Sequence, residues 1–504
     1  MIRIIYKHRD NVLLSYKPHE RGDLMPNLDL TLLTDFYELT MMQGYFNHKD
    51  RDKVVVFDLF YRSNPCGNSF SIAAGLEQVI HYINHLHFSD EDLQYLKDQK
   101  IFSKEFLQYL KDFHFSGDIY AVPEGTIVFP HEPIMKIIAP ICQAQLIESA
   151  LLNIINHQSL IATKASRVKW AAGDHTVLEF GLRRAQGPDA GIYGARAAMI
   201  GGCDATSNVL AGKMFDVPVK GTHAHSWVMS FDSELEAFRA YANLYPDSCL
   251  LLVDTYDTLR SGVPNAITIF RELYDQGLKP NIGIRLDSGD LSYLSKKARK
   301  MLDDAGFPEA IISASSDLDE FLIRDLRLQG SQIDLWGVGT NLITSSDCPA
   351  FGGVYKLSAI FQDGEYTPKI KLSNNPVKVT NPGNKKIIRV YHKESGKIIA
   401  DLIALDDEVY DEKDDLLLFS PESPWKKTLL NGNTYSLREL LQPIYKDGQQ
   451  VYHSPSTMEI KSYCTQELET LWDESRRLVN PQPVYVDLSE KLYSLKQKMM
   501  MESN

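Results

Sequence analysis

The sequence predicts an α/β protein: an irregular (β/α) barrel, preceded by an N-terminal α+β domain and followed by a β-rich C-terminal region. Three observations predict this fold. Short apolar strands alternate with helices from about residue 141 to residue 356, a mixed pattern precedes this stretch, and charged β patterns follow it. Strands that alternate with helices imply a parallel sheet with right-handed crossovers.

Residues 28–140 are expected to form the α+β domain. Residues 32–45 have helical spacing, and the run VVVFDLFY at 54–61 is typical of a strand. Two further helices are expected at 76–87 and from Asp90 onward. The turn at 123–126 precedes two short apolar strands.

Residues 141–356 are expected to form the barrel, entered through a long helix at 143–166. The expected strands are residues 177–180, 217–220, 250–254, 282–287, 311–314 and 333–338. The expected helices between them include 234–244, 265–276, 291–304 and 318–328. About seven such units in about 200 residues favour a closed, somewhat irregular barrel, and a doubly wound open sheet is the alternative.

The two ends of the chain differ in character. Residues 357–504 begin with β-rich, charged segments and end in the helical pattern LSEKLYSLKQKM. Residues 1–27 are expected to be an N-terminal extension, because they carry charges throughout and lack the apolar core of a signal peptide. Either translation starts at Met25, or residues 1–24 form a flexible arm.

Composition excludes several classes of protein. The 504 residues are 44% hydrophobic and 24% charged, an ordinary globular balance, and the net charge of −13 argues against binding nucleic acid or a membrane surface. No apolar run reaches the ~18 residues of a membrane span. The six cysteines are scattered without a CxxC pair, which favours free thiols in the cytoplasm over disulfides or structural zinc.

Polar side chains follow every expected barrel strand, which is where barrel enzymes carry their active sites. The residues of interest are Arg183 and Arg184 after the first strand, Thr222, His223 and His225 after the second, and Thr255 to Asp257, Ser288 to Asp290, Ser315 to Asp317, and Thr340 with Asn341 after the later ones. Arginine suits bidentate binding of a carboxylate or phosphate. The sequence therefore predicts an active site for an anionic substrate at this rim.

Each of these residues also has a structural interpretation. Arg183 and Arg184 are consistent with surface charges, although neighbouring residues point opposite ways and only one needs to face a pocket. Arg285 lies within an apolar strand, so its charge is matched either by a ligand or by Asp287 in an ion pair.

The histidines and glycines leave similar alternatives. His223 and His225 share a face if extended, but no third zinc ligand lies nearby, so a chemical role for one competes with a structural role. Gly337 and Gly339 follow a late barrel strand, where such loops bind phosphate, and Gly352 and Gly353 extend the pattern; a simple turn is the alternative.

Taken together, these segments resemble the nicotinate phosphoribosyltransferase family over residues 28–357. The matching motifs are LLTDFYELTM from Leu32, FDLFYR from Phe57, GLRRAQGPD from Gly181, NVLAGK from Asn208, GTHAHSW from Gly221, LLVDTYDTLRSGVPN from Leu251, IRLDSGDL from Ile284, GVGTNLIT from Gly337 and FGGVYKL from Phe351. Each motif alone is weak, but the ordered set is specific.

The resemblance implies that nicotinate and phosphoribosyl pyrophosphate are joined into nicotinate mononucleotide, with release of pyrophosphate and hydrolysis of ATP, as a step of NAD biosynthesis. It implies a homodimer with shared active sites, and ATP as a co-substrate. The positions that match family sites are His225 as the phosphorylated histidine, Tyr37 as an aromatic supplied by the partner subunit, Thr222 and Arg285 at nicotinate, Arg183 in the substrate pocket, and Thr340 at the phosphoribosyl phosphate.

Physical reasoning adds two expectations. Cleavage of the glycosidic bond builds positive charge on the ribose, which Asp287 is placed to stabilise. The pyrophosphate leaving group needs Mg²⁺, whose ligands the sequence does not identify. The rival functions are a nicotinamide-specific transferase, whose neutral substrate needs no cationic partner, and a quinolinate-specific transferase, which needs no ATP and hence no phosphorylated histidine. The third rival is a non-catalytic nucleotide sensor, which would not need the histidine, the acids and both arginines together.

Overall fold

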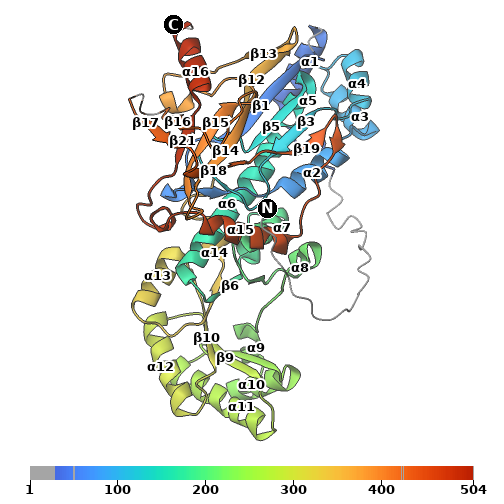
Figure 1. Ribbon diagram of the computed structural model, residues 1–504. Helices are drawn as coiled ribbons and strands as arrows, with labels where there is room; N and C mark the ends of the chain where they lie inside the picture. Colours follow the sequence, from blue (N-terminus) through green and yellow to red (C-terminus); the bar gives the residue numbers. More distant parts are fainter. Residues whose placement is uncertain (1–28, 49–50, 422, 424, 503–504) are drawn as a thin grey trace, which may run out of the picture.

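The computed structural model describes residues 29–48, 51–421, 423 and 425–502. The expected extension at residues 1–27 lies outside this part of the chain. The described chain forms a seven-stranded antiparallel sheet, a six-stranded parallel sheet and a second six-stranded sheet, with a small pair of strands, β2 (Ser71–Ile72) and β4 (Ile127–Val128) (Figure 1). No helix of the described residues is long and apolar enough to cross a membrane.

The antiparallel sheet draws its strands from both sides of the barrel segment. Its order is β13 (Glu365–Pro368), β12 (Gly353–Gln362), β1 (Val54–Tyr61), β5 (Met135–Pro140), β3 (Asp118–Ala121), β19 (Gln442–Lys446) and β20 (Gln449–Gln450). The interior strand β1 pairs with β5 on one side and with β12 on the other. The N-terminal segment therefore depends on later residues to complete its sheet.

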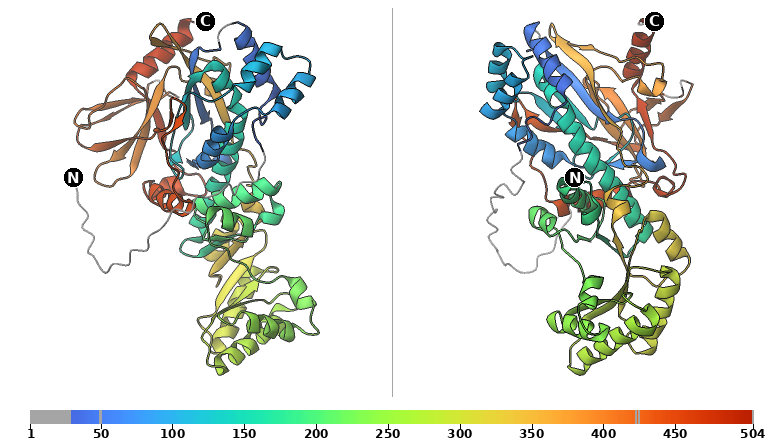
Figure 2. Two further views of the ribbon diagram at one scale, coloured as in Figure 1. Left: turned by 90° about the vertical axis from the view of Figure 1, so that its right-hand side faces the viewer. Right: turned by 180° about the vertical axis from the view of Figure 1, so that it is seen from behind.

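Helices accompany this sheet and share its hydrophobic core. They are α1 (Phe36–Asn47), α2 (Leu76–His85), α3 (Asp90–Asp98), α4 (Lys104–Lys111), α5 (Ile141–Leu146) and the start of α6 (Glu148–Ala172). The single long helix expected at 143–166 is interrupted at Ile147, where α5 ends and α6 begins. From there α6 runs down to the barrel (Figure 2).

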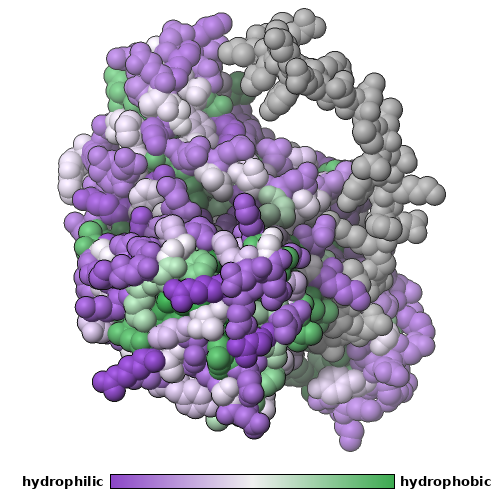
Figure 3. Space-filling model, turned by 90° about the horizontal axis from the view of Figure 1, so that it is seen from below, coloured by the Kyte–Doolittle hydropathy of each residue, from purple (hydrophilic) through white to green (hydrophobic). Residues whose placement is uncertain are grey.

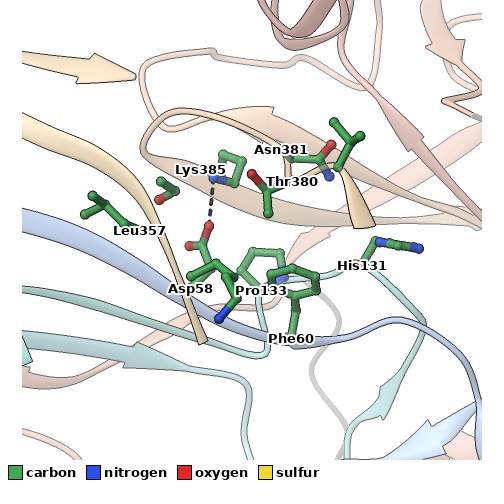
Figure 4. Close-up of a pocket in the computed structure, with 11 residues that line it drawn as sticks. Asp58, Phe60, His131, Pro133, Leu357, Thr380, Asn381 and Lys385 are labelled. Atoms are coloured by element: carbon green, nitrogen blue, oxygen red, sulfur yellow. Dashed lines mark ion pairs between the residues drawn. The ribbon is translucent and has the colours of Figure 1, made fainter. Parts of the chain in front are cut away.

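The second six-stranded sheet belongs to the C-terminal region. Its order is β17 (Lys427–Leu430), β16 (Leu416–Phe419), β21 (Tyr485–Leu488), β15 (Ile398–Leu405), β14 (Lys385–His392) and β18 (Tyr435–Glu439), and α15 (Thr457–Glu469) and α16 (Glu490–Glu502) complete the region. Lys385 of β14 reaches Asp58 of β1 in a buried ion pair of 2.7 Å beside a small cavity (Figure 4). This ion pair joins the two sheets.

The parallel sheet forms the barrel. Its order is β7 (Ala205–Thr206), β6 (Thr176–Glu179), β11 (Leu335–Val338), β10 (Ile311–Ser315), β9 (Asn281–Leu286) and β8 (Ser248–Leu252). The first long strand, β6, pairs with the last, β11, which is the arrangement of neighbours in a barrel and not in a doubly wound sheet. The predicted barrel is thereby confirmed.

The barrel is not fully closed, contrary to the expectation of a closed sheet. The expected strand at 217–220 reduces to a single bridge between Val219 and Thr206, and no ladder joins it to β8. We call this gap between Val219 and β8 the open seam. The two-residue strand β7 was missed, because a strand so short has no period to read.

The barrel helices are α7 (Pro188–Ile200), α8 (Val209–Phe215), α9 (His225–Met229), α10 (Glu234–Leu244), α11 (Val263–Asp275), α12 (Leu291–Asp304), α13 (Glu320–Leu328) and α14 (Thr340–Ile343). The bounds of α10 and α12 are those that the sequence predicts. Small and β-branched side chains of strands and helices fill a second large core. Seen from below, the barrel end of the molecule is mainly hydrophilic with smaller hydrophobic areas (Figure 3).

Candidate active site

Arg285 lies at the centre of a polar cluster at the C-terminal end of β9. Its Nε donates to Ser315 Oγ at 2.9 Å, Nη1 donates to Thr222 Oγ1 at 3.1 Å, and Nη2 donates to Asp287 Oδ1 at 3.1 Å. Ser315 Oγ also donates to Asp287. The predicted residues Thr222, Arg285 and Asp287 are therefore brought together from separate strand ends.

The orientation of the Arg285 guanidinium is fixed by its neighbours. It lies over the ring of Phe180, which follows β6, with 5.5 Å between Cζ and the ring centroid. Three of its five N–H groups are used by these neighbours, and one N–H on each Nη is left, which is the geometry that binds a carboxylate in a bidentate manner.

His225 begins α9, beside this cluster. Its Nε2 lies 3.1 Å from Asp254 Oδ1; the imidazole is 40% exposed, whereas the carboxylate is only 2% exposed. The other oxygen of Asp254 accepts hydrogen bonds from the Asp287 amide at 2.9 Å and from Ser288 Oγ at 2.6 Å. One buried carboxylate thus connects the histidine to the turn that carries Asp287.

His223 has a different environment. It is buried, and its Nε2 accepts a hydrogen bond from the Leu252 amide of β8 at 3.2 Å. Burial lowers the pKa of His223 to about 4, and the nearby Arg285 and His225 add to this effect. These contacts describe a neutral, structural histidine at the open seam, whereas His225 faces solvent.

Arg183 and Thr340 lie on the segments that follow β6 and β11. Arg183 is exposed in a short 3-10 turn, three residues after Phe180, and no hydrogen bond or ion pair engages its side chain within the described residues. Thr340 is half-buried at the first position of α14. Within the described residues, no hydrogen bond or ion pair joins either side chain to the Arg285 cluster.

The four glycines have packing reasons of their own. A Cβ at Gly337 would approach the Phe180 ring to 2.7 Å, and one at Gly339 would lie 3.2 Å from the Phe180 carbonyl oxygen. A Cβ at Gly353 would collide with Asn156 at 2.1 Å, whereas Gly352 has open space around it. The expected phosphate-binding role of these glycines stays a prediction, because packing alone explains Gly337 and Gly353.

Tyr37 lies far from this cluster in the same chain. It is exposed on α1 at one end of the molecule, whereas α9 and β9 lie toward the other end (Figures 1 and 2). Partial desolvation of the hydroxyl and the negative charge of Glu148 raise the pKa of the Tyr37 phenol, so the hydroxyl stays protonated. Tyr37 therefore does not reach the Arg285 cluster of its own chain.

Sequence reasoning assigned no role to three residues of the cluster. Asp254 ends an apolar strand, and a carboxylate at that position is the signal that could have singled it out. Phe180 was taken as part of a strand, because an aromatic residue at a strand end looks like core. Ser315 gave no signal stronger than that of any serine after a strand.

A metal site has few residues available. The described residues contain no group of three or more His, Cys, Asp or Glu side chains placed to hold a metal ion. Both oxygens of Asp254 are engaged, and Asp287 uses Oδ1 for Arg285 and Ser315. Mg²⁺ often needs only one or two carboxylates when substrate phosphates supply the rest, so Asp287 fits such a site through Oδ2.

An open-seamed barrel whose strand ends gather an arginine, two carboxylates and an accessible histidine defines an enzyme that acts on an anionic substrate. Comparison with known proteins identifies which one. Residues 32–156, 175–381 and 384–496 match the N-terminal domain, the central family region and the C-terminal domain described for nicotinate phosphoribosyltransferase.

Relatives from distant organisms agree. The nicotinate phosphoribosyltransferase of Bacillus subtilis is 48% identical over 94% of this chain and 96% of its own length. The Caenorhabditis elegans protein of the same name is 38% identical over 94% of this chain and 93% of its own length. The chain therefore belongs to the nicotinate phosphoribosyltransferase family and is an enzyme.

Solved structures support the same fold. The crystal structure of human nicotinic acid phosphoribosyltransferase superposes with a TM-score of 0.82 at 29% identity, covering 92% of this chain and 99% of that one. Nicotinate-nucleotide pyrophosphorylase from Pyrococcus furiosus, at 22% identity, reaches a TM-score of 0.64 over 90% of this chain and 98% of its own, which shows a shared fold.

Proposed function

We propose that this enzyme joins nicotinate to phosphoribosyl pyrophosphate, with release of pyrophosphate, and that it couples this step to ATP through phosphorylation of His225. The observation that carries the coupling is the Asp254 carboxylate, which holds His225 with one oxygen and the Asp287–Ser288 turn with the other. A change at His225 is thereby passed to the residue beside the reacting ribose.

Arg285 is the group that selects nicotinate. Its two remaining N–H groups match the carboxylate of nicotinate, and its ties to Thr222, Ser315 and Asp287 fix their direction. Nicotinamide is neutral and lacks the carboxylate that would pair with this arginine. Arg183 and Thr340, on the segments after β6 and β11, are proposed to contact the substrate and the phosphoribosyl phosphate.

The phosphoryl step follows from the His225–Asp254 pair. A carboxylate only accepts hydrogen bonds, so Nε2 carries the proton and the lone pair lies on Nδ1. That lone pair attacks the γ-phosphorus of ATP; the N–P bond forms as the bond to ADP breaks, and ADP leaves with the electron pair. Water later cleaves the N–P bond, which returns free His225 and phosphate.

Asp287 is proposed to stabilise the positive charge that develops on the ribose as pyrophosphate leaves. Bound Mg²⁺ would neutralise the charge of the leaving pyrophosphate, and Asp287 Oδ2 is the oxygen we expect to hold it, with substrate oxygens. Arg285 and Ser315 keep Asp287 in place through its other oxygen.

We propose a homodimer in which α1 of one subunit covers the barrel rim of the other. Exposed apolar side chains lie on both surfaces, Phe36, Tyr37 and Met41 on α1 and Val209, Leu210, Met229 and Tyr256 on the barrel. Such pairing would bring Tyr37 to the partner's nicotinate. The free cysteines fit a cytoplasmic enzyme.

The test is a turnover assay with nicotinate, phosphoribosyl pyrophosphate and Mg²⁺, with and without ATP. The wild type should form nicotinate mononucleotide faster with ATP and should form an acid-labile phosphoenzyme. His225→Asn should lose the phosphoenzyme and the ATP stimulation but keep a slow, ATP-independent synthesis. Nicotinamide and quinolinate in place of nicotinate test the rival substrates.

His223→Asn is the matched control, because it changes a neighbouring histidine that does not face solvent. It should keep the phosphoenzyme. Loss of the phosphoenzyme in His223→Asn and its retention in His225→Asn would show that the wrong histidine was chosen. Full ATP stimulation in both variants would exclude a phosphohistidine mechanism for this chain.

A further inference from the structure

A large cavity lies away from the Arg285 cluster, under the opposite end of the barrel. Its volume is about 340 Å³, within the range of small-molecule sites. It is lined by the end of α6, by Gly173 and Asp174 before β6, by Gly201, Gly202 and Asp204 before β7, by α15 and by the segment 475–477. Because the Arg285 cluster follows the strands and this cavity precedes them, the two sites are separate.

The lining is cationic in a chain whose net charge is −13. It contains five basic and three acidic side chains, a surplus of two positive charges: Arg167, Lys169, Lys461, Arg476 and Arg477 against Asp174, Asp204 and Glu469. Lys169 and Lys461 share Asp204, at 3.0 and 3.1 Å, and Arg167 pairs with the buried Glu320 at 2.8 Å. Arg476 and Arg477 of the C-terminal segment are therefore the two lining cations that no carboxylate of the described residues engages in an ion pair.

Arg476 is prepared for an anion. Its guanidinium stacks on Trp170 with 3.8 Å between Cζ and the ring centroid, and no carboxylate of the described residues forms an ion pair with it or with Arg477. Stacking covers one face of a guanidinium and leaves its N–H edge free for in-plane hydrogen bonds. Burial lowers the pKa of Arg476, and the negative charges of Asp473 and Glu469 oppose this effect only in part.

Asn68 adds a second unsatisfied group. The buried Oδ1 of this residue has no hydrogen-bond donor among the described residues, and Asn68 lines the same cavity. A buried acceptor without a donor costs free energy that a ligand hydroxyl would recover.

We propose that this cavity binds a hydroxyl-bearing organic phosphate, with the phosphate on Arg476 and Arg477 and a hydroxyl on Asn68. A phosphate monoester carries about two negative charges at neutral pH, which match the surplus of the lining. The volume exceeds the needs of inorganic phosphate and accommodates a sugar. The site gives the C-terminal segment a role that the catalytic chemistry does not assign to it.

The test is isothermal titration of the full chain with glucose 6-phosphate, with glucose as the neutral match and inorganic phosphate as the bare anion. Glucose 6-phosphate should bind and glucose should not. Arg476→Gln and Arg477→Gln should each weaken binding by about tenfold, the loss of one charge-assisted hydrogen bond. Asn68→Ala should weaken glucose 6-phosphate but leave inorganic phosphate unchanged.

Two controls locate the binding. Arg271→Gln removes an exposed arginine from α11 and should change nothing. Arg285→Met disables the catalytic cluster and should also leave the binding of glucose 6-phosphate unchanged. The proposal would be overturned if glucose 6-phosphate did not bind to the wild type, or if Arg476→Gln and Arg477→Gln bound it with wild-type affinity. Loss of glucose 6-phosphate binding in Arg285→Met would also overturn it. Arg477 is exposed, so its variant tests the site even if Arg476→Gln fails to fold.

Discussion

His223 takes the place of a missing strand neighbour, and its replacement tests that role. The Leu252 amide points away from β9 into the open seam, where no backbone carbonyl meets it, and it donates to His223 Nε2 at 3.2 Å. His223→Leu keeps an apolar side chain of similar size but removes the acceptor. Leaving this buried amide unsatisfied should cost about 1–3 kcal/mol.

The stability that is lost in His223→Leu relative to the wild type should become smaller as the pH falls. The pKa of His223 is lowered to about 4 in the folded chain, from an ordinary value of about 6.5 in the unfolded one. Between these values only the unfolded chain binds the proton, so wild-type stability falls as pH drops through this window and is unaffected above it. At about pH 5 the loss should approach 2 kcal/mol, roughly, and the leucine variant does not share it.

The assay combines thermal unfolding at about pH 7.5 and about pH 5 with hydrogen exchange of the peptide that contains Leu252. At the higher pH the variant should be less stable and should exchange faster at Leu252; at the lower pH the difference in stability should shrink. His453→Leu, which changes an exposed histidine, is the control. The reasoning would be refuted if the difference in stability between variant and wild type were the same at both pH values, or if hydrogen exchange at Leu252 were unaltered in the variant.

Three further predictions follow from other contacts. Arg285→Met should raise the KM for nicotinate by roughly 10- to 150-fold, the loss of about 1.5–3 kcal/mol from one charge-assisted interaction, and unchanged kinetics would refute its role. Tyr37→Ala and Arg183→Ala, each weak alone, should regain activity as mixed dimers; verified heterodimers without activity would argue against a shared site. Asp58→Asn should destabilise the chain by about 3–5 kcal/mol in urea unfolding, because it leaves Lys385 buried without its partner, and adding Lys385→Met should restore part of the loss.

The barrel was predictable because its strands are short apolar runs and its helices are amphipathic. The helix at 291–304, for example, starts after Asp290, whose side chain accepts from the Tyr293 amide and caps it. The pairing of β12 with β1 was not predictable, because some 300 residues separate the two strands and local patterns say nothing of such partners.

The active site, too, was predictable from the sequence only in part. Arg285 and Asp287 were found because a charge in an apolar strand is unusual, and the structure places them in one cluster. Asp254 acts through two oxygens toward different loops, which is a relation between strands and leaves no trace in local spacing. Tyr37 was assigned through the resemblance alone, since nothing in its own segment indicates a distant site.

The position of β1 between β5 and β12 also has a consequence while the chain is being synthesised. When residues 54–140 have left the ribosome, β1 has its partner β5, but its other edge has none until residues 353–362 emerge. During that interval, while the whole barrel segment is made, an apolar strand presents unpaired amides and carbonyls to its surroundings. The nascent chain is therefore most prone to aggregate before its β12 segment arrives, and a fragment that ends before residue 353 should need a chaperone that the full chain can dispense with.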